Sequence, residues 1–249
     1  MVKRRKSKKK TTRKIIKDYK NTNYFLWQYS QQTGIKQVFD WIGDVKLHII
    51  GNPKTKLINL IKKNTTEILE KYPTGNLRLI NIVEPLKPLK VAEVKGKELY
   101  YKLVNPIGQY NEGKVITIFD VEKFDDLINK KSDLFMKKKD IDVNTFEKQI
   151  YTYAIWHEYG HHLFYEIPKL CDKKALRSLK NRLTYFIKKN EPLTNYVEGY
   201  SNDLGAMINE TFAESFAIEH KAIPKMYYNK TTLENLSKVF AKWKNDYGI

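Results

Sequence analysis

The residues of this chain whose types and spacing could do chemistry lie in the segment His157-Glu158-Tyr159-Gly160-His161, an H-E-x-x-H motif. On a helix, residues four apart lie one above the other on the same face, so the two imidazoles can hold one metal ion between them. Glu158 lies about 100° around the helix axis from His157, which places its carboxylate beside that ion. The motif therefore offers two ligands of a catalytic zinc site and a carboxylate that can take a proton from a water molecule.

The residues around the motif favour this interpretation over a chance match. Apolar residues on both sides repeat at helical spacing and predict a helix over residues 146–166 (Ile150, Tyr153, Ala154, Leu163 and Phe164). A single His in such a helix is more often a packed core residue than a ligand. Two His four residues apart with a Glu between them reverse that preference. His162 points about 100° away from His161 and is expected to pack beside the site.

A third ligand is expected on a second buried helix downstream. Apolar residues repeat at helical spacing there (Met207, Ile208, Phe212, Ala213, Phe216 and Ala217). Glu210 and Glu214 lie one turn apart on this helix, and a buried carboxylate is costly unless it is paired or binds a metal. We expect Glu210 to be the third zinc ligand and Glu214 to accept a hydrogen bond from a ligand His. The alternative is that both carboxylates lie on a solvated flank.

These two motifs resemble those of the gluzincin metallopeptidases, in which H-E-x-x-H is followed by a Glu on a later helix, often as N-E-x-x-x-[DE]. Asn209-Glu210 with Glu214 matches that form, and the spacing from His161 is similar to that in the protease domain of anthrax lethal factor and its stand-alone relatives. The resemblance extends over roughly residues 110–220. It implies one Zn²⁺ per chain and a zinc-dependent endopeptidase in which Glu158 is the general base.

The same resemblance implies a Tyr before the ligand Glu that stabilises the transition state. Tyr200 is the nearest candidate and Tyr196 the next, although their offset from Glu210 is longer than in that family. In zincin-like folds the edge of the sheet lies above the metal and pairs with an extended peptide. Residues 114–119, with Val115, Ile116 and Thr117 at their centre, are the candidate for this substrate-binding edge. The alternative is that they form an ordinary internal strand.

The remaining pattern predicts an α+β protein. Strands are expected at residues 45–50, 77–83, 99–104 and 114–119, with helices from Asn52-Pro53 to Pro73, over 121–130, over 173–189 behind an Asp172 cap, and from Thr231 onward. We expect one zincin-like domain over residues 21–249. Its mixed α/β part (21–140) would carry a small mixed sheet, and its helical part (141–249) would carry the zinc ligands.

The formal net charge is +18, and residues 1–20 carry +10 of it, since eleven Lys or Arg face a single Asp. This segment is expected to be a flexible basic arm that could bind nucleic acid or an acidic surface, or could act only as a solubilising tail. The aromatic residues that follow could stack on bases, but we favour a place in the core for them (Tyr24, Phe25, Trp27, Tyr29, Phe39 and Trp41).

The sequence shows no signal peptide after the basic residues and no stretch that approaches the roughly 20 apolar residues of a membrane span. A single Cys171 leaves no internal disulfide framework and fits a reducing compartment. We expect a cytoplasmic protein, or one of the virion or host cytoplasm if it is phage-encoded, that acts on a protein or peptide substrate. Two alternatives are a nucleic-acid- or virion-associated binding or structural protein that works through its basic arm, and a protein with a closed structural zinc site.

Overall fold

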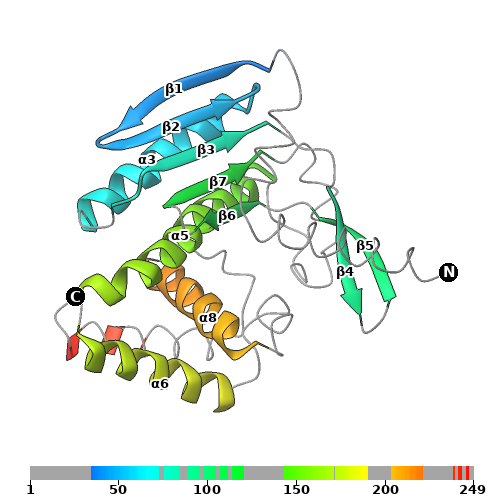
Figure 1. The fold of residues 1–249 in the computed structure, drawn as a ribbon. Helices are drawn as coiled ribbons and strands as arrows, with labels where there is room; N and C mark the ends of the chain where they lie inside the picture. Colours follow the sequence, from blue (N-terminus) through cyan, green and yellow to red (C-terminus); the bar gives the residue numbers. More distant parts are fainter. Residues whose placement is uncertain are drawn as a thin grey trace.

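A computed structural model describes residues 35–72, 76–84, 89–95, 98–104, 107–111, 114–120, 143–170, 172–189 and 203–220, with residues 238, 241, 242, 245 and 246. Over these residues the protein is α+β, with a five-stranded mixed sheet, a two-stranded sheet and four long helices, which confirms the predicted class (Figure 1). Several predictions lie outside the described residues: the basic arm (1–20), the helix over 121–130, Cys171, Tyr196, Tyr200 and most of the final helix.

The main sheet has the order β1-β2-β3-β7-β6. Its strands are β1 (Gln37–Ile42), β2 (Val45–Ile50), β3 (Leu79–Val83), β7 (Val115–Phe119) and β6 (Gly108–Asn111). The three central strands β2, β3 and β7 are parallel, and the two outer strands run antiparallel to their neighbours. The smaller sheet is the antiparallel pair β4 (Leu89–Lys95) and β5 (Glu98–Val104). Strands β3 and β7 are apolar except for one central residue each, Asn81 and Thr117, which suits strands that are covered on both faces.

The strand that we expected to form the substrate-binding edge is internal. β7, which contains Val115, Ile116 and Thr117, lies between β3 and β6, so that prediction is wrong and the alternative interpretation is right. The reason is in the composition of the two strands. A strand flanked on both sides can be largely apolar, as β7 is apart from Thr117, whereas the outer strand β6 has the polar sequence Gly-Gln-Tyr-Asn. β6 was not predicted, and neither were β1 and β4.

Helix α3 (Thr55–Lys71) begins later than predicted, with Lys54 rather than Asn52 at its N-cap position. The backbone N–H of Asn52 donates to Oε2 of Glu84 (3.0 Å), and that of Lys54 donates to Oδ2 of Asp120 (2.7 Å). These bonds hold the segment before α3 against the residues that follow β3 and β7. The tertiary contacts therefore override the local Asn-Pro capping signal.

Helices α5 (Val143–Leu170), α6 (Lys173–Lys189) and α8 (Leu204–Glu219) fall where helices were predicted. The Asp172 cap of α6 is confirmed, because its Oδ1 accepts the backbone N–H of Ala175 at 2.7 Å. Helices α3 and α5 share one hydrophobic core with the sheet, to which the three central strands contribute fully buried side chains (Leu47, Ile80, Ile82, Ile116 and Ile118). In the part of the chain that the structure describes, no helix is long and apolar enough to cross a membrane.

Buried polar contacts fix α5 against the sheet and against α3. Asp120, which follows β7, accepts the hydroxyl of Tyr151 at 3.0 Å, and Lys54 pairs with Glu147 at 3.0 Å. Further along α5, the indole N–H of Trp156 donates to Oδ1 of Asn64 on α3 at 3.0 Å. Because buried polar atoms are costly to leave unpaired, these contacts define one position for α5 in the core.

Phe39 and Trp41 on β1 are 53% and 62% exposed, so the prediction that they lie in the core is wrong. β1 is an outer strand, and these two residues alternate with Ile42 and Asp40, whose carboxylate pairs with Lys62 of α3. Phe39 packs instead on the ring of His48, with the centroids 4.4 Å apart. The other aromatic residues of this group precede the described residues.

Helices α5 and α8 cross with their backbones in close contact at Gly160. A Cβ atom on Gly160 would lie 2.8 Å from Cα and 3.2 Å from the carbonyl oxygen of Ala213, and 3.2 Å from Cβ of Phe216. Gly160 is therefore the residue of the H-E-x-x-H motif that lets α8 approach the two His. Glu210 lies one turn before Ala213 on α8, so this contact also sets the distance of its carboxylate from α5.

We expect Gly160→Ala to destabilise the protein, because the added methyl group can be accommodated only if the backbone of α8 moves. Overpacking of this kind costs about 1–3 kcal/mol, which exceeds the gain of up to about 1 kcal/mol from replacing a helical Gly. Urea unfolding measures the change. Gly205→Ala is the matched control, since its Cβ would contact only Oδ1 of Asp203, at 3.3 Å. A Gly160→Ala protein as stable as the parent would contradict the close contact.

Candidate metal centre

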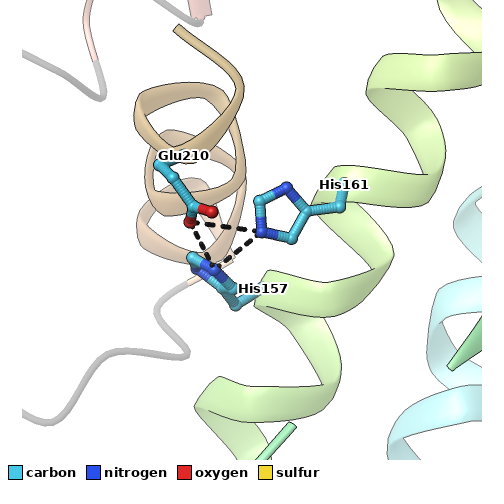
Figure 2. Close-up of side chains that lie close together, drawn as sticks. All are labelled: His157, His161 and Glu210. Carbon is cyan, nitrogen blue, oxygen red and sulfur yellow. Dashed lines mark hydrogen bonds and ion pairs between the residues drawn. The ribbon is translucent and has the colours of Figure 1, made fainter. Parts of the chain in front are cut away.

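The side chains of His157, His161 and Glu210 converge inside the protein (Figure 2). The two Nε2 atoms lie 3.0 Å apart, and Oε2 of Glu210 lies 3.4 Å from Nε2 of His157 and 3.3 Å from Nε2 of His161. All three residues are buried. The structure thus brings together the three metal ligands that the sequence predicted.

Two helices supply these groups. His157 and His161 extend from successive turns of α5, and their rings are nearly perpendicular, at 86°, with centroids 4.7 Å apart. Glu210 extends from α8 into the angle between the rings. The arrangement requires the i, i+4 spacing on α5 and the close approach of α8 at Gly160, so local sequence and tertiary packing both contribute to it.

Nδ1 of each imidazole ring is hydrogen-bonded, and this bond determines whether Nε2 of the neutral ring carries a hydrogen or a lone pair. Nδ1 of His161 lies 3.1 Å from Oδ1 of Asn209, an acceptor, so Nδ1 carries the hydrogen. Nδ1 of His157 lies 3.1 Å from the hydroxyl of Tyr153, which donates its own hydrogen to Oε1 of Glu214 at 2.8 Å. The Tyr153 oxygen therefore accepts from Nδ1 of His157. Both neutral rings direct the Nε2 lone pair towards the convergence point.

The donor set fits a zinc ion. Ligand bonds of about 2.0–2.2 Å in tetrahedral geometry separate the ligand atoms by roughly 3.3–3.5 Å, close to the 3.0, 3.3 and 3.4 Å found here. Oε2 of Glu210 is buried and has no hydrogen-bond partner among the described residues. The Nε2 lone pairs of the two His and Oε2 of Glu210 face one another and repel. A cation between them, either a proton or a metal ion, relieves this repulsion.

The electrostatics show that the cluster holds a proton tightly when no metal is bound. Burial alone lowers the pKa of His161, but the neighbouring Glu210 carboxylate outweighs burial and raises it to about 9. Burial lowers the pKa of His157 as well, but the hydrogen bond to Glu210 and the charges of Glu214 and Glu158 together outweigh it, so this pKa is also raised. In Glu210 burial raises the pKa, yet the two imidazoles outweigh it and hold the pKa well below its usual range.

Glu158 lies on the side of α5 that faces the sheet. A Cβ on Gly108 of β6 would lie 2.8 Å from its Oε1, so the outer strand passes directly over the carboxylate. The backbone N–H of Tyr110 donates to this carboxylate, and His157 and His161 also favour its charged form. Burial outweighs these effects and raises the pKa of Glu158. A buried carboxylate with a raised pKa beside a candidate metal site is suited to accept and release a proton.

His162 packs beside the site, as expected, and makes a specific contact there. It is fully buried, and its Nδ1 lies 3.2 Å from the hydroxyl of Tyr110. The ring of Tyr110 also stacks with Tyr165 of α5, with centroids 5.6 Å apart. Tyr110 thereby joins the outer strand β6 to three successive turns of α5, at Glu158, His162 and Tyr165.

Sequence analysis missed some residues of the site and placed others only approximately. Glu214 reaches His157 through Tyr153, whose role was missed although it lies one turn before His157, a spacing that could have revealed it. Asn209 was recognised only as part of a motif. Gly108 and Tyr110 could not have been found, because β6 was not predicted. Tyr200 and Tyr196 lie outside the described residues, so their proposed role stays a prediction.

Comparisons of the chain with protein families, with curated proteins and with solved structures find no match. The interpretation of the site therefore rests on its own geometry and chemistry.

The raised pKa values predict how pH affects the stability of the metal-free protein. A His whose pKa is about 9 when folded and 6.5 when unfolded stabilises the fold fully below pH 6.5, and this contribution is lost as the pH rises through about 9. We therefore expect the free energy of unfolding of the metal-free protein to fall between pH 6.5 and 9.

Zinc should reverse this fall in the free energy of unfolding. The ligands bind metal only when they are deprotonated, and bound zinc therefore stabilises the fold more as the pH rises. Thermal melts with a chelator and with excess zinc across this pH range measure both trends, and His161→Gln should remove them. Parallel pH profiles with and without zinc would contradict the assignment of these residues.

The hydrogen bonds around the site predict graded effects on zinc affinity, measured by competition with a chromogenic chelator. The parent protein should bind one zinc per chain, and Glu210→Ala should lose most of this affinity because a ligand is removed. Tyr153→Phe should weaken binding by about 10–100-fold, since it removes only the group that orients His157. Tyr185→Phe, on the exposed face of α6, is the matched control. Equal affinity in the Tyr153→Phe and parent proteins would argue against this orienting role.

Proposed function

We propose that the protein is a zinc-dependent endopeptidase. The observation that carries the proposal is the buried convergence of His157, His161 and Glu210, with the Glu158 carboxylate on the adjacent face of α5. Two neighbouring carboxylates have opposite pKa shifts here, as expected when one serves as a ligand and the other transfers protons.

A zinc ion at this site would supply a Lewis acid that polarises a peptide carbonyl and lowers the pKa of a water molecule towards about 7. The residues of the chain do the rest. Glu158, with its raised pKa, accepts a proton from water and passes it to the leaving amine. Asn209 and Tyr153 hold the two His rings in the tautomer that the metal requires.

A site for an extended peptide is supported by the position of β6. The carbonyl of Ile107 and that of Asn111 accept hydrogen bonds from the β7 side, from Phe119 and Lys114. Because alternate residues of an antiparallel strand direct their backbone groups to opposite sides, those of Gly108 point away from β7, beside Glu158. We propose β6, in place of the predicted residues 114–119, as the strand along which substrate aligns.

Two further observations support a catalytic metal of the gluzincin type over a structural one. Structural zinc sites are usually closed by four protein ligands, and the described residues supply three. An antiparallel outer strand next to an H-E-x-x-H helix, with the third ligand on a later helix, is the arrangement that a zincin-like fold would require. The fold family and the peptidase activity remain parts of this proposal.

The test is Glu158→Gln, assayed on unfolded protein substrates and on a diverse library of fluorogenic peptides. We expect one zinc per chain to be retained, because the ligands are untouched, and hydrolysis to fall by about 10²–10⁴-fold. Glu70→Gln, a matched change on the exposed face of α3, should leave the rate unchanged.

A Glu158→Gln protein that cleaves as fast as the parent would overturn the role of Glu158. A parent protein that binds zinc and cleaves none of these substrates would overturn the peptidase assignment.

A further inference from the structure

Helix α6 has an unusual charge composition. Its 17 residues include seven Lys or Arg and no Asp or Glu (Lys173, Lys174, Arg177, Lys180, Arg182, Lys188 and Lys189). The helix lies at the rim of the molecule, beyond α8 and far from the sheet (Figure 1). The metal centre makes no use of these cations.

The cations are on a helix whose apolar side is already occupied. Ala175, Leu179, Leu183 and Phe186 are buried, so α6 is held in place by the core and has no apolar face left to insert into a membrane. On the opposite side, six residues at helical spacing line an open groove of about 480 Å³ (Lys174, Arg177, Ser178, Asn181, Arg182 and Tyr185). We call this set the α6 groove.

Most of the cations on α6 have no counterion in the part of the chain that the structure describes. Elsewhere, Lys56, Lys62 and Lys114 each pair with an acidic residue of another element. On α6 only Arg182 has such a partner among the described residues, Asp246. Like charges concentrated on one rigid surface favour a polyanionic ligand, because binding releases the repulsion between them.

The groove also presents an aromatic ring among the cations. Tyr185 is 61% exposed, and Nζ of Lys189 lies 4.8 Å from its ring centroid. An exposed ring beside Lys and Arg is the combination that binds unpaired bases by stacking while cations contact the phosphates. Ser178 and Asn181 add hydrogen-bond donors for phosphate or sugar oxygens. An acidic peptide would need the cations but not the ring.

We propose that the α6 groove binds single-stranded nucleic acid, with Lys174, Arg177 and Arg182 contacting phosphates and Tyr185 stacking on a base. The residues from Lys174 to Tyr185 span about 16 Å along the helix axis, enough for a few nucleotides. This function is independent of the proposed peptidase and uses a different surface from the basic segment 1–20.

The test compares binding of a fluorescent oligothymidine 20-mer to the full chain and to variants, across a range of salt concentrations. The variant Lys174→Gln, Arg177→Gln and Lys188→Gln removes three exposed cations of α6 for which the described residues supply no ion pair. The matched control removes three exposed lysines elsewhere, by Lys36→Gln, Lys63→Gln and Lys148→Gln. Both variants keep the same net charge and the same N-terminal segment, and melting curves establish that both are folded.

We expect the α6 variant to lose at least tenfold in affinity near 150 mM salt. The slope of log affinity against log salt should decrease in magnitude by about 1.4, since the variant removes two of the proposed phosphate contacts, Lys174 and Arg177, and each single-strand contact contributes about 0.7. The control variant should bind like the parent. Tyr185→Ala should weaken binding by about tenfold with an unchanged salt slope, because stacking releases no ions.

Equal losses in the α6 and control variants would show that only net charge matters and would overturn the proposal. The proposal would also fail if the α6 variant bound the oligonucleotide as tightly as the parent, because all of the binding would then lie on another surface. Tyr185→Ala binding like the parent would overturn the single-strand assignment. Polyglutamate binding that depends on these cations, without oligonucleotide binding, would identify an acidic protein partner instead.

Discussion

At Gly160 the backbones of α5 and α8 approach so closely that one added methyl group would lie 2.8 Å from Cα of Ala213. The rest of the candidate site depends on this contact. It brings Glu210 to within 3.4 Å of both His Nε2 atoms. Because glycine costs helix stability, its presence inside a buried helix is explained by the close packing that it permits.

The surroundings of each buried carboxylate then determine the direction of its pKa shift. Glu210 faces two imidazoles, which hold its pKa low, so it stays charged and suits a cation. Glu158, one residue after His157, faces the outer strand β6, where burial raises its pKa. The two acids thus acquire different roles from the elements that they face. Asn209 and Tyr153 accept hydrogen bonds from Nδ1 of His161 and His157, and these bonds define which nitrogen of each imidazole carries the hydrogen.

The charges of the molecule follow two different patterns. Around the sheet, α3 and α5, several cations are paired with buried or half-buried carboxylates, as in the contacts of Lys54 and Lys56 with Glu147, and these pairs connect elements. On α6 most of the cations are exposed, and among the residues that the structure describes only Arg182 has a counterion. The first pattern serves the fold, whereas the second is a surface available to an anionic partner. A peptidase site and a nucleic-acid surface on one chain would place cleavage near a nucleic-acid-bound substrate.

The sequence alone was sufficient to predict the three candidate metal ligands and the helices that carry them. The i, i+4 spacing of His157 and His161, and the helical repeat around Glu210, are local properties, and the structure brings these three residues together as predicted. The α+β class followed from the same periodicities. The pairing of the strands could not be predicted, because β6 is short and polar and has no periodic pattern. Its place beside Glu158 also depends on contacts with residues far away in the sequence.

Only the tertiary structure decided which strand lies outermost, which side chains orient the imidazoles, and why Phe39 and Trp41 are exposed. The physical reason is the same in each case. Helical spacing is a property of residues that are neighbours in the sequence. Burial and hydrogen-bond partners depend instead on which distant elements the chain packs together.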